Sequence, residues 1–414
     1  MNTSTSTSTV PTTMNLNAHH AGTAGRSLAG RAPSVAIEVS PIPFNRPFMV
    51  GTELEYVRQA HTHLQLAGDG RFTARCSQWL ERTVGCQKAL LTHSCTAALE
   101  MAAILADIKP GDEVIMPSFT FVSTANAFVL RGGVPVFVDV RADTLNLDER
   151  QVEAAITQRT RAIVVVHYAG VACEMDTIMD IASRHGILVI EDAAQALLST
   201  YRNRPLGSIG SLATLSFHET KNITSGEGGA LLINDPALVE RAQVIREKGT
   251  NRTQFMAGNV ARYTWMDIGS SYLPGEMTAA FLWGQMEAAR LINERRIAIW
   301  EAYHRALEGL EAQGRLQRPG TPPECTANAH LYFVLLPPKV NRAGFIACLA
   351  RQGVGAVSHY VPLHSSPGGR QYGRFNGSMA NTDALSERLV RLPLWIGLEA
   401  EQQRVITAVK SALA

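Results

Sequence analysis

The sequence has almost no excess charge of either sign and no long apolar segment. Its 38 Lys and Arg residues and 36 Asp and Glu residues leave a formal net charge of +2 over 414 residues. This near-balance gives no support to a nucleic-acid-binding or membrane-surface role. No apolar run approaches the roughly 20 residues that a transmembrane helix needs. At 46% hydrophobic and 18% charged residues, the composition is typical of an ordinary globular protein.

Metal-binding and disulfide patterns are also lacking. The six cysteines include no CxxC pair. The close histidine pairs, His19 with His20 and His61 with His63, have no matching set of carboxylates or cysteines. We therefore expect no metal site, and buried, reduced thiols in a cytoplasmic protein.

Residues 1–40 have too little apolar character to form a core. They begin with the Ser/Thr repeat MNTSTSTSTVPTT, which predicts a disordered tail. The tail has neither the basic start nor the continuous apolar core of a secretory signal. The remaining chain is long enough for a large domain, predicted over residues 41–290, and a smaller C-terminal α/β domain over residues 291–414.

Short aliphatic runs alternate with helical patterns through the first part of this chain. A long amphipathic pattern over residues 276–310 then predicts one helix that links the two domains. The alternation predicts right-handed crossovers and a mostly parallel sheet with helices on both faces. The expected strands are residues 112–117, 136–140, 162–167, 187–190 and 212–217, and the helices among them are residues 147–156 and 174–185.

Two of these strands end beside ionisable residues. Asp192 follows the run 187–190, at the edge where an open α/β sheet places its ligands, and Lys221 lies just beyond the strand 212–217. Singly, Asp192 could be a turn or cap residue and Lys221 a solvated surface charge. Together they would suit pyridoxal phosphate, with the lysine forming a Schiff base and the acid holding the pyridinium proton. The following GEGGALLIN is not a dinucleotide fingerprint, because it precedes a strand, and it predicts a turn.

The motifs around these two residues carry a family resemblance. EDAAQ at 191–195, followed by SFHETKNITSGEGG at 216–229, resembles the DegT/DnrJ/StrS sugar aminotransferases, from about residue 42 to the C-terminus. The resemblance implies pyridoxal phosphate, a type I aspartate aminotransferase-like fold and a homodimer with shared active sites. It makes Lys221 the covalent anchor and proton carrier and Asp192 the partner of the ring nitrogen. Relatives with histidine at the lysine position catalyse a dehydration, so Lys221 indicates a transaminase.

Further cofactor contacts follow from the resemblance alone. It implies that Cys95 and Thr96 contact the phosphate at the start of a helix capped by Ser94 or Thr96. On the local sequence, an ordinary capped helix explains this stretch equally well. The resemblance also places Ser216 at the phosphate and Gln195 beside the phenolic oxygen.

Aromatic residues near the predicted cofactor have alternative roles. The resemblance places Phe121 over the pyridine ring, with Phe119 as the alternative and a core phenylalanine as the simpler reading of either. His218 occupies a position where relatives vary, so we expect it to pack.

The substrates and the subunit contact are implied less directly. Relatives have Asn-Tyr-Arg where this chain has Ser271, Tyr272 and Leu273, so Ser271 would replace an asparagine that reaches the neighbouring subunit's cofactor. The serine and the leucine depart from that motif, and the contact depends on the serine alone. The string GSSYLP at 269–274 resembles the branch that makes dTDP-4-amino-4,6-dideoxygalactose.

The resemblance accordingly implies L-glutamate as donor and a dTDP-linked 4-keto-6-deoxy sugar as acceptor. A 3-keto sugar, a cyclitol, or a non-catalytic regulatory role are the alternatives. Tyr360 and His364 match positions near the sugar, and either could equally be a packing residue. Arg246 or Arg252 could bind the donor carboxylate, and the sequence does not decide between them.

Overall fold

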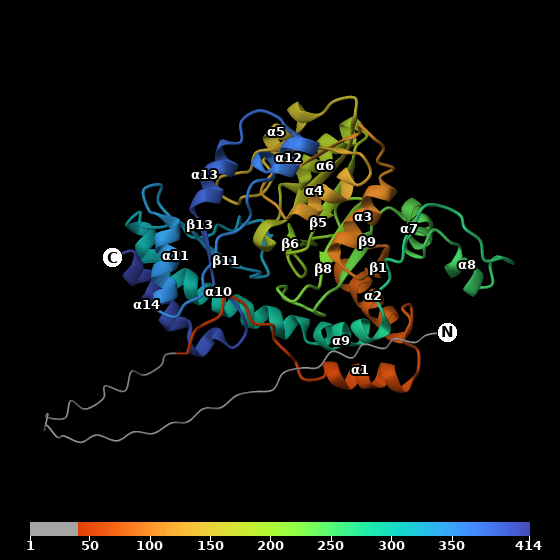
Figure 1. Cartoon of the computed structure of the whole chain (residues 1–414), viewed down its shortest axis with the longest axis horizontal. Helices are drawn as coiled ribbons and strands as arrows, with labels where there is room; N and C mark the ends of the chain where they lie inside the picture. Colours follow the sequence, from red (N-terminus) through yellow and green to blue (C-terminus); the bar gives the residue numbers. More distant parts are fainter. Residues whose placement is uncertain (1–39) are drawn as a thin grey trace, which may run out of the picture. The chain divides into compact units, whose positions relative to one another are not determined.

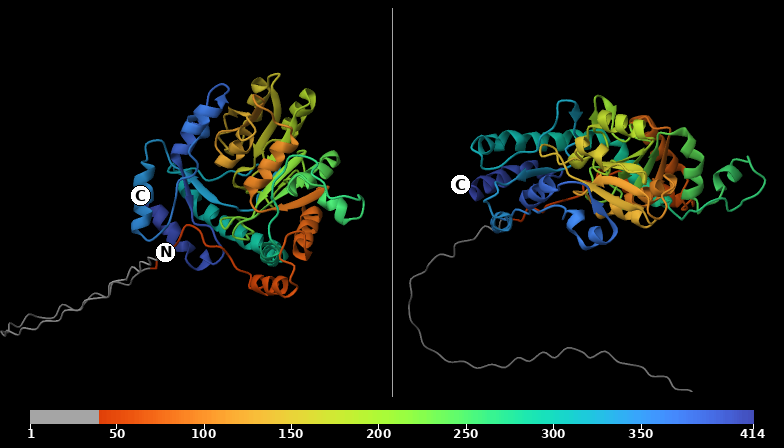
Figure 2. Two further views of the ribbon diagram at one scale, coloured as in Figure 1. Left: turned by 45° about the vertical axis from the view of Figure 1, so that its right-hand side comes forward. Right: turned by 90° about the horizontal axis from the view of Figure 1, so that it is seen from above.

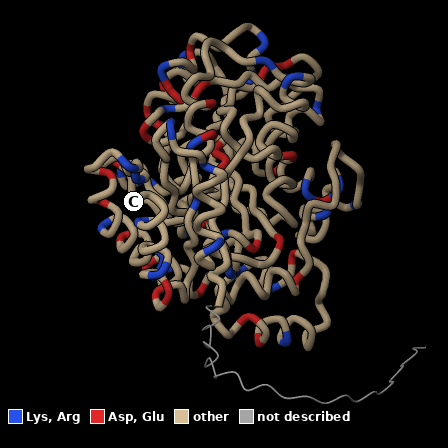
Figure 3. The backbone as a smooth tube through the Cα atoms, turned by 60° about the vertical axis from the view of Figure 1, so that its left-hand side comes forward, with Lys and Arg blue, Asp and Glu red and all other residues tan. Residues whose placement is uncertain are grey.

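The computed structural model describes residues 40–414 (Figure 1). The predicted disordered tail lies almost wholly outside the described residues. Among residues 40–414, none of the helices combines the length and the apolar character needed to span a bilayer. Basic and acidic residues are interspersed along the backbone in Figure 3, in keeping with their near-equal numbers.

A central eight-stranded sheet organises the fold. Its order is β1-β9-β8-β5-β4-β2-β3-β12, and β9 alone runs opposite to its neighbours. The mostly parallel sheet predicted from the alternating pattern is therefore confirmed, and the predicted turn at GEGG joins β8 to β9. The strands are β1 Lys88–Thr92, β2 Glu113–Pro117, β3 Val134–Val138, β4 Thr160–Val166, β5 Leu188–Asp192, β8 Leu212–Ser216, β9 Gly229–Ile233 and β12 Arg374–Phe375.

Helices cover both faces of this sheet because successive strand residues point to opposite sides. On β4, Ile163 and Val165 join one buried cluster while Ala162 and Val164 join another. The first cluster also takes side chains from α2 Arg71–Val84, α5 Glu149–Ala155, α6 Met175–His185 and α9 Glu276–Glu287. The second takes them from α3 Cys95–Leu105, α4 Val122–Val129 and α7 Val239–Arg246.

The C-terminal part has its own apolar core. Two antiparallel strands, β11 Tyr332–Leu335 and β13 Leu389–Leu392, pack with α10 Ala289–Ala312, α11 Arg342–Arg351 and α14 Gln402–Ala412. Between α11 and β13, the chain returns to the main sheet through α12 Pro367–Tyr372, β12 and α13 Ala380–Arg388. The domain boundary near residue 290 stays a prediction.

The prediction of a single long helix over residues 276–310 is wrong in that the segment forms two helices. The structure has two helices, α9 and α10, separated at Ala288, whose φ of −97° and ψ of 6° are not helical. Neither proline nor glycine marks the break, so no residue type at this position signals it. Figure 1 shows α10 running on from α9 toward α11 and α14.

Shorter elements lie around this frame. The helix α1 Glu53–Thr62 packs on α9. Figures 1 and 2 show the segment with α8 Arg252–Met256 projecting outward from α7. A small three-stranded sheet combines β6 Thr200–Tyr201, β7 Arg204–Pro205 and β10 Cys325–Thr326.

Candidate active site

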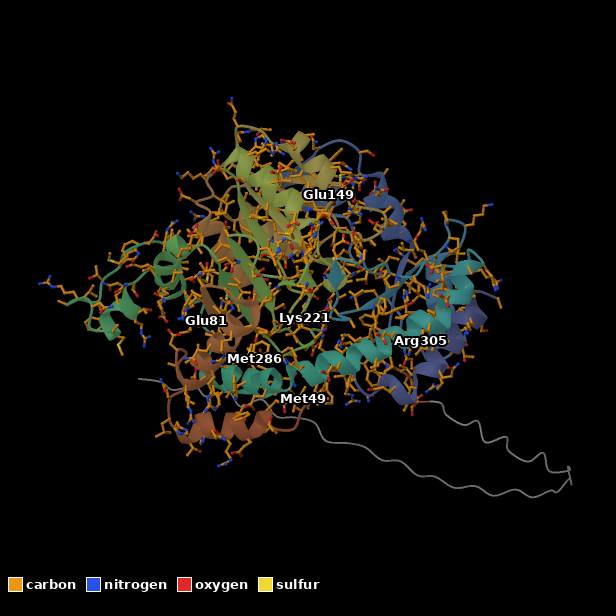
Figure 4. The ribbon with its side chains drawn as sticks, turned by 180° about the vertical axis from the view of Figure 1, so that it is seen from behind. Met49, Glu81, Glu149, Lys221, Met286 and Arg305 are labelled. Atoms are coloured by element: carbon orange, nitrogen blue, oxygen red, sulfur yellow. The ribbon has the colours of Figure 1, made fainter. Side chains whose placement is uncertain are left out.

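A cavity of about 630 Å³ opens at the carboxyl ends of β5 and β8. Figure 4 places Lys221 in the middle of the fold, where these strands approach the C-terminal part. Eight of the ten predicted site residues line this cavity: Cys95, Thr96, Phe121, Asp192, Gln195, Ser216, Lys221 and Tyr360. The other two, Ser271 and His364, do not.

Asp192 is a buried carboxylate with unfilled bonding capacity. Thr124 Oγ1 donates to its Oδ2 at 2.7 Å, and the backbone N–H of Ala194 donates to its Oδ1 at 3.2 Å. No lysine, arginine or histidine among residues 40–414 forms an ion pair with it, and it lines the cavity. Burial raises the pKa of Asp192, and the hydrogen bond from Thr124 opposes that rise. A cation placed in the cavity against this carboxylate would supply the missing partner.

Its neighbour Glu191 shows the contrast, because it points to the other face of β5. Its carboxylate accepts hydrogen bonds from His167 Nε2 at 2.9 Å and from three backbone N–H groups, those of Gly207, Ile209 and Gly210. Burial alone would raise the pKa of Glu191, but these hydrogen bonds lower it. Both carboxylate oxygens of Glu191 therefore have hydrogen-bond donors, and the residue has a structural role in holding the loop after β7.

Lys221 lines the same cavity and lies on the loop after β8. Burial lowers the pKa of its amine, while the charge of Asp192 partly offsets that effect. The backbone N–H of Lys221 donates to the carbonyl of His218 at 2.9 Å, which fixes the loop. A lysine with a lowered pKa is a better nucleophile at neutral pH than a solvated one.

The start of α3 offers hydrogen-bond donors to the cavity. Ser94 is the helix cap, and its Oγ accepts from the backbone N–H of Ala97. The N–H groups of the first turn face outward with the positive end of the helix dipole, next to the hydroxyls of Thr96 and Ser123, which lie 2.8 Å apart. Gly229 allows this approach, because a Cβ there would lie 2.4 Å from the carbonyl carbon of Ser94. This end of the cavity is suited to an anion.

The two candidate aromatic rings have different surroundings. The side chain of Phe121 is 56% exposed and lines the cavity. Phe119 is buried in a cluster with Tyr168 and Tyr360. Phe121 is thus the ring available to a ligand, and its role over a cofactor stays a prediction.

Gln195 and Tyr360 connect the sheet to the C-terminal part. The Gln195 amide accepts from the backbone N–H of Ala169 at 2.8 Å and donates to the Tyr360 hydroxyl at 3.0 Å. Tyr360 stacks on His359 with ring centroids 3.7 Å apart. Since the Tyr360 oxygen accepts from Gln195, its own proton can be donated into the cavity.

Several predicted residues lie elsewhere. Ser271 is exposed and forms a backbone bridge with Glu247, and His364 is 2.8 Å from the Ser118 hydroxyl. Arg246 pairs with Asp69 at 2.6 Å.

Arg252 and His218 also differ from expectation. Arg252 does not line the cavity, and lies on the projecting α8. The expectation that His218 packs is wrong: its side chain is 41% exposed at the cavity wall, where its Nδ1 lies 2.9 Å from the Thr220 hydroxyl.

Three of the cavity-lining residues that were not predicted from the sequence bear on its chemistry. Thr124 holds Asp192, and its position one helical turn after Phe121 was a usable signal. Arg391 and His330 come from the C-terminal part, and nothing in the sequence near them indicates a cavity. His330 Nδ1 lies 3.0 Å from Asn222 Oδ1, next to Lys221 in the chain.

The residues present fit pyridoxal phosphate. The buried carboxylate of Asp192 lacks a cation and a protonated pyridine nitrogen is one, the start of α3 suits its phosphate, and Lys221 suits its aldehyde carbon. These three features lie around one cavity.

Solved aminotransferase structures share this fold. The chain superposes with a TM-score of 0.82 on the aminotransferase TlmJ from Streptoalloteichus hindustanus, at 28% identity over 90% of this chain and 98% of that one. It superposes with a TM-score of 0.83 on Spr1654 from Streptococcus pneumoniae, a candidate sugar aminotransferase solved in its PMP form, at 25% identity over 90% and 99% of the two chains. The fold and the site therefore define a pyridoxal phosphate-dependent aminotransferase of fold type I.

The family follows from the sequence as a whole. The model of the DegT/DnrJ/EryC1/StrS aminotransferase family matches residues 48–410, and the chain belongs to this family. A relative from Methanocaldococcus jannaschii, the uncharacterized protein MJ1066, is 33% identical over 353 residues, covering 83% of this chain and 91% of the relative. The predicted family, fold class and cofactor are confirmed, and the protein is a sugar aminotransferase.

Proposed function

We propose that this enzyme transfers the amino group of L-glutamate to C4 of dTDP-4-dehydro-6-deoxy-D-glucose, giving dTDP-4-amino-4,6-dideoxy-D-galactose. The transfer itself is supported by one observation above others, the placement of Lys221 and Asp192 on the walls of a single cavity. The choice of acceptor is supported by GSSYLP at 269–274, which resembles the branch acting on this sugar.

Lys221 and Asp192 have complementary roles in this proposal. Pyridoxal phosphate, when bound, supplies a ring that accepts the electron pair left on the donor carbon. Asp192 keeps a proton on the ring nitrogen. Lys221 would anchor the cofactor, and its amine Nζ, once released, would carry the proton that leaves the donor carbon. Positioned proton transfer of this kind contributes about 10²–10⁴-fold to the rate.

The remaining predicted residues would position the cofactor. Cys95 and Thr96, through the first turn of α3, and Ser216 would hold the phosphate, since all three line the same cavity. Phe121 would cover the ring. The Gln195 amide would lie beside the phenolic oxygen, fixed there by its bonds to Ala169 and Tyr360.

Two residues are assigned to the sugar with different degrees of structural support. Tyr360 lines the cavity with a hydroxyl proton free to donate, which supports a sugar contact. His364 bonds Ser118 and lies 3.3 Å from Asp383, outside the cavity lining. We therefore propose Tyr360 as the sugar contact and His364 as a residue that fixes the loop around it.

We propose a homodimer in which Ser271 of each chain lies near the partner's site. Ser271 is exposed and away from its own chain's cavity, and exposed apolar side chains lie close by in the chain, Trp265 at 79% and Met266 at 61%. Light scattering should give about twice the 44.9 kDa chain mass. Trp265→Glu and Met266→Glu together should give monomers, and a wild-type mass of one chain would contradict the proposal.

The substrate assignment is tested by the position of the new amine. Purified enzyme is incubated with L-glutamate and one of three acceptors, dTDP-4-dehydro-6-deoxy-D-glucose, its 3-keto isomer or a keto-cyclitol, and NMR identifies the aminated carbon. We expect product only from the 4-keto sugar, with nitrogen on C4. Amination at C3, or turnover only with a keto-cyclitol, would overturn the assignment. Lys221→Ala should give no product and should lose the absorbance of the lysine-bound cofactor.

A further inference from the structure

Arg391 faces the active-site cavity, and none of the acidic residues that the structure describes forms an ion pair with it. It lies on β13 between Val390 and Leu392, whose side chains are buried in the C-terminal core, so its own side chain points the other way. Its Nε donates to the Ser358 carbonyl at 3.3 Å, and its guanidinium lies 4.7 Å from the ring centroid of Phe44. No carboxylate among residues 40–414 pairs with it, so its two terminal nitrogens are available to a ligand.

The other arginine on the cavity wall is already bonded to backbone carbonyls. Arg296 also lines the cavity, but its guanidinium donates to the carbonyls of Ala329 and His330, at 3.2 and 2.6 Å. Arg246 and Arg252, the two arginines considered from the sequence, lie outside the lining.

The surroundings of Arg391 favour an anion. Burial lowers the pKa of its guanidinium, but an arginine starts so high that it stays protonated at neutral pH. A half-buried cation without a counter-charge is costly, and an incoming anion removes that cost. The groups around it are the phenols of Tyr168 and Tyr360 and the amine of Lys221, none of which is an anion at neutral pH.

We propose that Arg391 binds the α-carboxylate of the amino donor and so selects α-amino acids as donors. This rests on the proposed transamination and assigns a residue to one of its substrates. The guanidinium fork matches a carboxylate in a two-bond geometry.

Position favours the donor carboxylate over the sugar diphosphate. Arg391 lines the same cavity as Lys221, and its Nε bonds the carbonyl of Ser358, two residues before the cavity-lining Tyr360. In an α-amino acid the carboxylate is bonded to the same carbon as the reacting amine. In a nucleotide sugar the diphosphate is attached at C1, across the ring from C4. An anion site in the same cavity as Lys221 therefore fits the amino acid.

The test measures the donor half-reaction in the cofactor-loaded enzyme. L-glutamate is mixed with enzyme lacking acceptor, and the loss of the lysine-bound cofactor absorbance is followed against donor concentration. In Arg391→Gln the apparent Kd for L-glutamate should rise about 10- to 100-fold, the scale of hydrogen bonds between charged groups. The apparent Kd of Arg391→Lys for L-glutamate should lie between those of the wild type and Arg391→Gln. Arg252→Gln and Arg370→Gln, which remove charges outside the cavity lining, should match the wild type.

Two controls distinguish loss of the carboxylate contact from a general loss of reactivity or of anion binding. Propylamine has an amine and no carboxylate, so its slow reaction should be unchanged in Arg391→Gln. Calorimetry with 2-oxoglutarate and with dTDP then separates the two anions, and the variant should lose affinity for 2-oxoglutarate only. Unchanged glutamate affinity, or a loss confined to dTDP, would overturn the proposal.

Failure of the proposed function gives a different result. If wild-type enzyme does not react with L-glutamate but does with another amino acid, the donor assignment is wrong and Arg391 is tested with that amino acid. Melting temperature and cofactor content within the wild-type range show that each variant is folded.

Discussion

Thr124 Oγ1 donates a 2.7 Å hydrogen bond to Oδ2 of Asp192, which lies 68 positions further along the chain. Because that proton is committed to Asp192, the Thr120 hydroxyl, 2.8 Å away, must donate to Thr124. Two hydroxyls in series thus orient the acid toward the cavity. The pair forms because the turn into α4 lies beside the carboxyl end of β5.

We expect Thr124→Val to lower kcat/KM for L-glutamate by about 10- to 100-fold, since a hydrogen bond to a charged group contributes about 1.5–3 kcal/mol. The carboxylate would lose its orienting donor while the packing volume is kept. Thr124→Ser keeps the hydroxyl and should stay close to wild type. Steady-state rates and cofactor retained after dialysis provide the measurement, and equal loss in both variants would argue against the hydrogen bond.

Substitutions of the adjacent residues Asp192 and Glu191 should have opposite effects on activity and stability. Asp192→Asn should lower kcat about 10²–10³-fold, the usual scale for losing one preorganised charge contact in an active site, with little effect on melting temperature. Glu191→Gln should lower the melting temperature and leave kcat largely intact, because its carboxylate accepts four hydrogen bonds far from the cavity face. The reverse pattern would show that the two faces of β5 have been assigned wrongly.

Much of the fold could be predicted from the sequence because its strands are short aliphatic runs that end at polar residues or turns. The runs ending at Asp192 and Ser216 are of this kind, and a parallel sheet brings such ends to one edge. The break at Ala288 could not be predicted, since it depends on how α9 and α10 pack and not on a residue that disfavours helix.

The site was predictable only in part, for a related reason. Lys221 and Asp192 follow strands in a recognisable pattern, and both line the cavity. Arg391 stands in a strand of the C-terminal part, and only the tertiary fold brings it to the cavity. Because Arg391 stands between two aliphatic residues in a strand, the sequence predicts that its side chain points away from the core of the C-terminal part. The sequence does not predict which surface or cavity the side chain faces.

The close approach of Gly229 to α3 can be tested by adding one methyl group. A Cβ at Gly229 would lie 2.5 Å from the backbone nitrogen of Cys95, so Gly229→Ala should displace the start of α3. We expect a loss of about 1–3 kcal/mol in unfolding free energy, as for other overpacked sites, and weaker cofactor binding. Gly309→Ala, in the exposed part of α10 with nothing within 4 Å, should be neutral or stabilising. Denaturant melts and fluorescence titration with pyridoxal phosphate measure both effects.

Glu113 should make stability depend on acid pH. Its carboxylate accepts from Arg374 Nε at 3.0 Å and Nη2 at 2.8 Å, and from Arg159 at 2.7 Å. Chiefly through Arg374, its pKa is lowered from 4.5 to about 2. A lowered pKa in the folded state means that the stabilisation is complete above pH 4.5 and is lost as the pH falls toward 2.

Glu113→Gln should remove that part of the pH dependence. The difference in urea midpoint between wild type and variant should be constant above pH 5 and should shrink as the pH falls from 4.5 toward 2. A difference that does not change with pH would show that the ion pairs contribute nothing.

The contact of Glu113 with Arg374 has a mechanical consequence. The chain leaves the main sheet along α10, adds β11 to the C-terminal core, returns to place β12 against β3, and then goes back to form β13. The C-terminal part is therefore joined to the main sheet in two places, through α10 and through β12. It cannot rotate open about a single hinge, as it could if α10 were its only attachment. If the proposed nucleotide sugar is the acceptor, its entry and exit therefore have to rely on local rearrangement of the loops that carry Tyr360 and Lys221.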